Sequence, residues 1–308
     1  MLTIRAAIDI GTNTVLLLVA ESDGNTVIPL LEKHEIPRLG RQVDAARNLS
    51  RESIRKVETV LRNYRDIITS GYGDIPVIVT ATSAVRDASN RDHFLDYIKK
   101  NTGFDIRILS GDDEAEWTFF GALAPLVLPP EQPVLVVDIG GGSTELAAGR
   151  KDQLQKFLSM DMGSVRYTER YLKHGPPAPG DIATCREAIR ACLENSGLKT
   201  DHGTVLTGVA GTVSTLAALC YNLANSEASR PDGMKISAEQ LKNIIAEIIP
   251  LSSEGILAMN PGVLKGREDV ILAGLLILEG VMDHFAFSEC IVSTGGIRHG
   301  ALLRAFDR

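Results

Sequence analysis

Cysteine is scarce in this sequence, and its spacing indicates neither metal nor redox chemistry. The 308 residues include four cysteines, Cys185, Cys192, Cys220 and Cys290, with no CxxC pair and no paired histidines nearby. Structural zinc sites and dithiol redox centres carry such spacings, so neither kind of site is expected. We expect four buried, reduced thiols.

Long apolar segments are also missing. The apolar run at the N-terminus is interrupted by Asp9 before any small-residue cleavage site, which excludes a signal-peptide pattern. The longest apolar stretch, residues 270–282, is broken by Gly274, Glu279 and Gly280 and is too short to span a bilayer. The sequence therefore predicts a cytoplasmic protein without a membrane partner.

Basic residues are fewer than acidic ones. Lys and Arg number 32 against 39 Asp and Glu, which gives a net charge of −7 at pH 7. General nucleic-acid binders need a widespread basic surface, so no nucleic-acid partner is expected. An anionic ligand would need a local basic patch, and one segment offers it, although a solvated charged face explains the same residues equally well. Its cations are Lys33, Arg38, Arg41, Arg47, Arg51, Arg55 and Lys56.

What the sequence does contain is an internal repeat. DIGTNTVLLLVAE at 9–21 and DIGGGSTELAAGR at 138–150 each follow an apolar strand, form a turn rich in glycine and hydroxyl residues, and re-enter an apolar segment. A chain of 308 residues also exceeds the usual size of a single core. We therefore predict two related domains, 1–127 and 128–308, with the last helix, about 297–308, packing back on the first.

Elsewhere the pattern alternates strands and helices, which predicts an α/β fold with mixed sheets. A stretch rich in proline and glycine, residues 174–180, is expected to be non-helical throughout. The expected helices are one that follows a Ser50 cap, then 90–101, 112–126, 164–173, 181–195, 212–223, one capped by Ser237 and a final one. The expected strands outside the repeats are 77–82, 105–109, 154–160, 204–208 and 289–294.

The two repeated turns are suited to binding phosphate. A glycine-rich turn lets the backbone come close to an anion and aim successive N–H groups at it, and Ser or Thr hydroxyls add donors. One such turn is weak evidence, because many are simply tight turns, but two in corresponding places are much stronger. The first contains Gly11, Thr12, Asn13 and Thr14, and the second contains Gly140, Gly141, Gly142, Ser143 and Thr144.

An aspartate ends the apolar strand before each turn. Asp9 and Asp138 would be costly there unless each is hydrogen-bonded, paired or bound to a metal. Mg²⁺ prefers one or two carboxylates together with water and phosphate oxygens, and Glu145 adds a carboxylate beside the second turn. These three residues are candidate metal ligands, and a turn-capping acid is the alternative for each.

Three further junctions carry candidate anion donors. TGVAGTVST at 207–215, with Gly211, and STGGIRHG at 293–300 place glycines at predicted helix N-termini, whose unpaired N–H groups attract anions. ATSAVRD at 81–87 carries Arg86, whose forked guanidinium suits phosphate, although an ordinary surface ion pair is the alternative.

Together these residues resemble the exopolyphosphatase and guanosine pentaphosphate phosphohydrolase family, a branch of the actin-like and sugar-kinase superfamily. The resemblance implies two ribonuclease-H-like domains that face each other across a cleft. It spans nearly the whole chain through eight ordered motifs: DIGTNTVLLLVAE, PRLGRQVDAARNLS, ATSAVRDASN, ILSGDDEAEWTFFGAL, DIGGGSTEL, MGSVRYTERYL, GVAGTVSTLAAL and STGGIRHGALL.

The resemblance also implies roles for individual residues. The glutamate before alanine in the family's SG..EA motif acts as the catalytic base, and here it falls on Glu114. The aspartate and glutamate of the family's DIGGGSTE motif, which are metal-linked acids, fall on Asp138 and Glu145, and the arginine of its AT..(V/L)R motif falls on Arg86. The implied cofactor is Mg²⁺, with Mn²⁺ as a substitute and a monovalent cation as a further option, and a homodimer is compatible with the family.

The function expected from this resemblance is release of terminal orthophosphate from inorganic polyphosphate by metal-dependent attack of water. The chain matches the family's short form, which lacks an additional helical C-terminal domain, so shorter polyphosphates should be favoured and Arg41 and Arg47 should contact them. Guanosine pentaphosphate or nucleoside triphosphate hydrolysis is the nearest alternative. A sugar-kinase-like or actin-like ATPase, or a non-catalytic sensor of alarmone or polyphosphate, would be different classes of protein.

Overall fold

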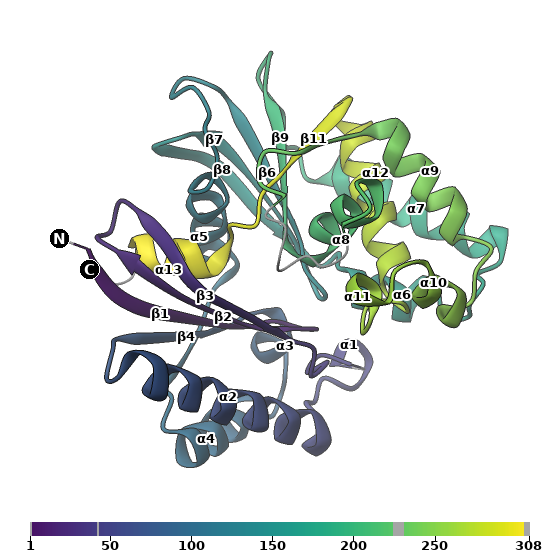
Figure 1. The fold of residues 1–308 in the computed structure, drawn as a ribbon. Coiled ribbons are helices and arrows are strands. Elements are labelled where there is room, and N and C mark those ends of the chain that lie inside the picture. The colour runs from purple at the N-terminus through teal and green to yellow at the C-terminus, as the bar shows by residue number, and fades with distance from the viewer. Residues whose placement is uncertain (1, 42, 224–230, 305–308) are drawn as a thin grey trace. The chain divides into compact units, whose positions relative to one another are not determined.

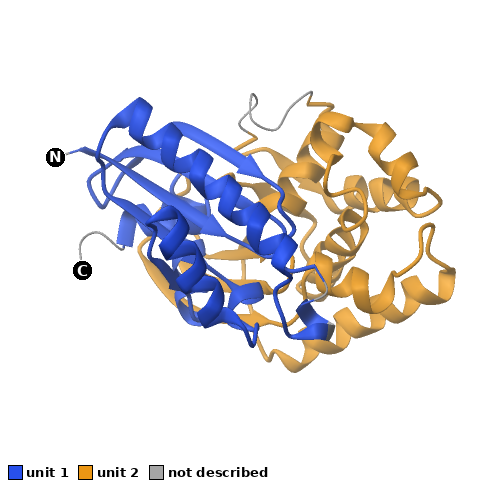
Figure 2. Ribbon diagram, turned by 90° about the horizontal axis from the view of Figure 1, so that it is seen from below, with its two compact units in different colours: residues 1–124, 295–308 blue, residues 125–294 orange. Residues whose placement is uncertain are grey.

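The computed structural model describes residues 2–41, 43–223 and 231–304. The chain forms two compact units, shown in blue and orange in Figure 2. Unit 1 combines the chain up to Ala124 with the segment that begins at Gly295, and unit 2 runs from Pro125 to Thr294. The division expected from the sequence, between 127 and 128, falls just after the boundary at Ala124.

The sheet of unit 1 has five strands in the order β3-β2-β1-β4-β5. β1 pairs antiparallel with β2, and β2 with β3, whereas β4 lies parallel to β1 and β5 parallel to β4. The strands are β1 Thr3–Ile10, β2 Val15–Ser22, β3 Val27–Glu35, β4 Val77–Ala81 and β5 Ile106–Ile108.

Helices cover both faces of this sheet, as Figure 1 shows. Alternate residues of β1 enter different cores, because successive side chains of a strand point to opposite faces. Ala6, Ile8 and Ile10 pack in the core that α2 and α4 share, and Ala7 packs with residues of α5 and α13. The helices are α1 Val43–Ala46, α2 Arg51–Tyr72, α3 Ser83–Arg86, α4 Arg91–Thr102, α5 Gly111–Leu123 and α13 Ile297–Arg304.

The sheet of unit 2 repeats this arrangement. Its order is β10-β11-β9-β6-β7-β8, so β8-β7-β6-β9-β11 matches β3-β2-β1-β4-β5 in order and in strand direction. Only β10 is additional. The strands are β6 Val134–Ile139, β7 Thr144–Arg150, β8 Gln153–Met160, β9 Val205–Val209, β10 Lys235–Ser237 and β11 Glu289–Val292.

This shared order of two antiparallel pairs followed by two parallel strands is the ribonuclease-H-like topology. The expected fold class, two such α/β units with mixed sheets, is therefore confirmed. The helices of unit 2 are α6 Ser164–Tyr171, α7 Pro179–Asn195, α8 Ala210–Cys220, α9 Ala238–Ile248, α10 Ser253–Met259, α11 Pro261–Leu264 and α12 Ile271–His284.

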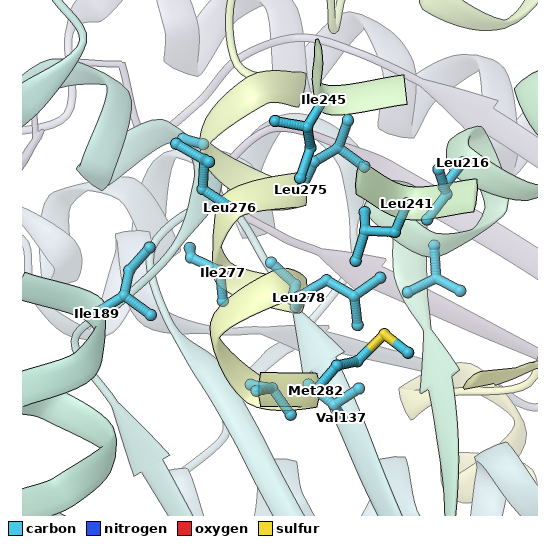
Figure 3. Packing of buried hydrophobic residues seen from close by; sticks show 14 of the residues in the cluster. Val137, Ile189, Leu216, Leu241, Ile245, Leu275, Leu276, Ile277, Leu278 and Met282 are labelled. Carbon is cyan, nitrogen blue, oxygen red and sulfur yellow. The ribbon is translucent and has the colours of Figure 1, made fainter. Parts of the chain in front are cut away.

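The most apolar segment of the sequence forms α12, at the centre of unit 2. Leu275, Leu276, Ile277 and Leu278 are consecutive and all fully buried, as only a helix surrounded by protein on every side permits. Figure 3 shows these side chains among those of the helices and strand packed around α12. Each such side chain contributes about 1.5–3 kcal/mol to folding. No helix in the described part of the chain is long and apolar enough to cross a bilayer.

Two local expectations were wrong, and one strand was not expected. Residues 174–180 are not wholly non-helical, because α7 begins at Pro179 and the first helical position tolerates a missing N–H. The sequence pattern did not indicate β3, an edge strand that contains Pro29 and a bulge. All four cysteines are free, but Cys192 and Cys220 are half-buried rather than buried.

Candidate active site

The first repeated turn joins β1 to β2 in unit 1. The Gly11 N–H donates to the Thr14 carbonyl at 2.9 Å, which closes the turn. Thr12 and Asn13, at its tip, are buried, and the Thr12 hydroxyl lies 3.1 Å from the Ser83 hydroxyl at the start of α3. The structure thus forms the tight turn that the sequence predicted at residues 11–14.

The segment that follows β3 returns to this turn. The N–H groups of Arg38 and Gly40 donate to the carbonyls of Asn13 and Thr12 at 3.1 and 2.7 Å. Gly40 is required there, since a Cβ would overlap the Thr12 side chain. Arg41 comes directly after Gly40 and is exposed, so the turn and the first cations of the predicted basic segment lie together.

The other cations of that segment differ in setting. Arg47 is exposed and its carbonyl accepts from the Ser89 N–H and hydroxyl, both at 2.7 Å. Lys56 forms an ion pair of 2.7 Å with Glu52 one turn earlier on α2, and both side chains are exposed. An exposed pair of this kind contributes little to stability, and Lys56 belongs to the outer face of the helix.

Asp9 is buried at the end of β1. The Thr80 hydroxyl on β4 donates to its carboxylate at 3.1 Å. Burial raises the pKa of Asp9 from 3.8 to about 6, against the opposing effects of the Thr80 hydrogen bond and of the Arg298 charge on α13. A bound cation would restore the ionised form, so the position fits the predicted role as a metal ligand, although a neutral acid fits it as well.

Glu114 lies in the first turn of α5. Ser110 caps this helix by accepting a hydrogen bond from the Asp113 N–H at 3.0 Å. Of the three consecutive acids, Asp112 is exposed and Asp113 pairs with Arg107 at 3.3 Å, whereas Glu114 is only 4% exposed. The helix start therefore turns Glu114 alone into the protein.

Arg86 binds Glu114 directly. Its Nη1 donates to Glu114 Oε2 at 2.9 Å and to the Leu109 carbonyl at 3.0 Å. The sequence predicted both residues for the site but assigned them separate tasks. The guanidinium fixes the orientation of the carboxylate.

The second repeated turn joins β6 to β7 in unit 2. The Gly140 N–H donates to the Ser143 carbonyl at 3.0 Å, the same closing bond as in unit 1. Ser143 and Thr144 are buried, and the Thr144 hydroxyl donates to the Met162 carbonyl. This hydroxyl is thus engaged within the protein, which argues against its predicted role as a phosphate donor.

Asp138 and Glu145 lie directly opposite each other on β6 and β7. Both are buried, and Glu145 accepts a hydrogen bond of 2.6 Å from the Ser159 hydroxyl. Carboxylates that face each other across paired strands repel unless a proton or a cation lies between them. The described residues contain no group of three or more His, Cys, Asp or Glu arranged to hold a metal. Two carboxylates nevertheless fit Mg²⁺, which completes its shell with water and phosphate oxygens.

Gly211 lies in the first turn of α8, after a residue of unusual conformation. Ala210 has a φ of 65°, which L residues rarely adopt and which turns β9 sharply into the helix. The guanidinium of Arg267 packs on Gly211, where a Cβ would overlap it. Burial lowers the pKa of Arg267 to about 10. Arg267 was not predicted from the sequence, because it is a single arginine in a loop without a recognisable motif.

The pKa of Asp9 makes a prediction for the metal-free protein. A raised pKa means that the protonated carboxyl stabilises the fold below pH 3.8, and this stability is lost as the pH rises through about 6. Asp9→Asn should therefore be more stable than wild type at pH 8 in EDTA, with a free energy of unfolding in urea that is higher by about 1–3 kcal/mol. Near pH 4 the two proteins should have the same free energy of unfolding. Equal stability at both pH values would contradict the shift.

Comparisons with known proteins agree with this architecture. Exopolyphosphatase 2 of Mycobacterium tuberculosis strain H37Rv is 33% identical over 290 residues, which cover 90% of this chain and 89% of that protein. The crystal structure of the Aquifex aeolicus member of the Ppx/GppA protein family has a TM-score of 0.80 at 29% identity, covering 99% of this chain and 98% of that one.

An exopolyphosphatase structure from Cytophaga hutchinsonii has a TM-score of 0.87 at 25% identity, with 99% and 98% of the two chains covered. The model of the Ppx/GppA phosphatase family matches residues 18–308. The match confirms the resemblance that the eight motifs indicated. The chain belongs to the Ppx/GppA phosphatase family, and is thus an enzyme that hydrolyses phosphoanhydride bonds.

Proposed function

We propose that this protein is an exopolyphosphatase, which releases terminal orthophosphate from inorganic polyphosphate, and that Glu114 activates the attacking water. One observation carries the catalytic part: a buried carboxylate at a helix start, held at 2.9 Å by Arg86. Relatives named as exopolyphosphatases, among them the one from M. tuberculosis, support the substrate.

In this mechanism the protein mainly neutralises and positions charge. Phosphoryl transfer to water needs an aligned nucleophile and stabilisation of the equatorial oxygens more than covalent chemistry. The N–H groups of the two glycine-rich turns and the cation Arg41 would hold phosphate oxygens. Glu114 would accept the proton of the water, and Arg86 would keep its carboxylate in one orientation.

Asp138 and Glu145 would hold Mg²⁺, or Mn²⁺ in its place, and Asp9 is a further candidate ligand. A divalent cation bound there would neutralise charge on the phosphate oxygens. Gly211, beside the Arg267 guanidinium, would offer an additional N–H at the start of α8.

A substrate panel tests the proposal. Purified protein with Mg²⁺ is given polyphosphates of several lengths, guanosine pentaphosphate and ATP, and orthophosphate release is measured. The highest kcat/KM on polyphosphate is expected. Preference for guanosine pentaphosphate would select the nearest alternative, ATP use that depends on a sugar or on polymerisation would indicate a kinase-like or actin-like enzyme, and binding without release would indicate a sensor.

Glu114 provides the first prediction of this proposal. Glu114→Gln keeps the size of the side chain but cannot accept a proton, so kcat should fall by roughly two orders of magnitude or more while KM changes little. Asp112→Asn, two residues earlier and exposed, is the matched control and should retain most activity. Turnover close to wild type in the Gln variant would exclude Glu114 as the base.

The second prediction concerns the proposed metal ligands Asp138 and Glu145. Asp138→Asn and Glu145→Gln should lose activity and need far more Mg²⁺ to regain any, because each removes one of two candidate ligands. Arg86→Ala, compared in the same titration, should lose activity at an unchanged metal requirement. Wild-type activity that persists in EDTA would refute metal dependence.

Chain length makes the third prediction. Two exposed arginines, Arg41 directly after the segment that meets the first turn and Arg47 six residues later, would steer a polyanion by an attraction that salt screens. Because this segment is short, it can hold few phosphates, and we expect distributive cutting with a preference for short chains. Gels of a long polyphosphate should show gradually shortening intermediates, and Arg41→Ala should raise KM more at low salt than Arg51→Ala. Intact chains that coexist only with orthophosphate would show processive cutting.

A further inference from the structure

The segment that connects β8 to α6 returns to the glycine-rich turn of unit 2. Donors of this segment form hydrogen bonds to the carbonyl oxygens of three consecutive turn residues. Gly140 accepts from the Ser164 N–H at 2.9 Å, Gly141 from those of Val165 and Arg166 at 2.9 and 3.0 Å, and Gly142 from Arg166 Nε at 2.6 Å.

These bonds determine where the N–H groups of the turn point. In a planar trans peptide, the carbonyl of one residue and the N–H of the next point in opposite directions. With the carbonyls of residues 140–142 held towards α6, the N–H groups of Gly141, Gly142 and Ser143 must point away from it. Within residues 2–41, 43–223 and 231–304 these three N–H groups donate to no protein acceptor.

Close packing keeps the two segments in this register. Gly163 precedes α6, and a Cβ there would overlap the backbone carbonyl of Gly141. Arg166 is only 6% exposed, and its Nη2 lies 3.5 Å from a carboxylate oxygen of Asp161. A buried guanidinium is costly, and here its Nε serves a carbonyl of the turn.

Unit 1 contains the same arrangement at the corresponding place. After β3, the N–H groups of Arg38 and Gly40 donate to the carbonyls of Asn13 and Thr12, so the N–H groups that follow these carbonyls point the other way. In both units the third strand leads back to the turn, with a glycine at the close approach. In unit 2 an arginine side chain adds to the backbone donors.

We propose that Arg166 is a positioning residue, which holds the Gly142–Ser143 peptide so that the Ser143 N–H joins those of Gly141 and Gly142 in binding a phosphate group. This inference rests on the proposed function for the identity of the ligand. The first two peptide planes are held by backbone donors, which no side-chain substitution removes. Loss of Arg166 should thus free the third peptide plane, so that the Ser143 N–H is no longer held in place to bind the phosphate.

The kinetic test compares Arg166→Met and Arg166→Lys with Arg170→Met, which removes the same charge from an exposed site on the same helix. A hydrogen bond to an anion contributes enough that Arg166→Met should raise KM for polyphosphate about tenfold, with kcat within about threefold. Arg166→Lys, which can still donate to the carbonyl, should be intermediate, and Arg170→Met unchanged. A KM within twofold of wild type in Arg166→Met would overturn the proposal.

A second measurement is independent of turnover. Inorganic phosphate should shift the backbone amide resonances of Gly141, Gly142 and Ser143 in the wild-type protein, and in Arg166→Met the Ser143 shift should be lost while the Gly141 shift persists. Equal shifts in both proteins would overturn the inference. If Arg166→Met does not fold, Arg166→Lys carries the test, and a KM equal to that of wild type in this variant would overturn the proposal. A wild-type protein that releases no phosphate but shows the three shifts would refute the proposed function and leave this inference standing.

Discussion

The direction of a few peptide planes is the constraint on which the candidate site depends. In each unit a strand carries an aspartate as its penultimate residue, a tight glycine turn follows, and the segment that leaves the third strand binds carbonyls of this turn. The carbonyls therefore lie on one side and the N–H groups on the other. N–H groups held in this way can bind an anion, which is how we propose that a protein with a net charge of −7 binds a polyanion.

Three carboxylates of the candidate site are also buried, and each has a defined hydrogen-bonding partner. Glu114 is bound by Arg86, Asp9 accepts a hydrogen bond from Thr80, and Glu145 accepts one from Ser159. Such contacts fix which way each carboxylate points. Burial raises the pKa of Asp9, and a carboxyl group with a raised pKa is common where a cation or a substrate binds.

The sequence predicted what depends on local chemistry. The turns at 11–14 and 140–144 could be recognised because glycine, hydroxyl residues and a terminal aspartate are contiguous, and the repeat itself predicted two similar units. Glu114 and Arg86 were each identified through the family motifs. Their ion pair was not, because it joins residues 28 positions apart and depends on how α3 and α5 pack.

The same reason explains what was missed. Arg267 meets Gly211 and Arg166 meets Gly142 only in the folded chain, and neither arginine has a distinctive local pattern. β3 escaped notice because an edge strand with a proline and a bulge lacks regular alternation. Conversely, the apolar run that forms α12 was correctly judged too short for a membrane span, and it forms the centre of a core.

In the proposed reaction, water attacks the terminal phosphorus atom of a polyphosphate. Hydrolysis in water enriched in ¹⁸O, followed by mass spectrometry of the products, tests it most directly, because the oxygen of the attacking water stays on the phosphorus that it attacks. One ¹⁸O atom is expected in each released orthophosphate and none in the shortened chain. Label in the remaining chain, or orthophosphate without label, would contradict it.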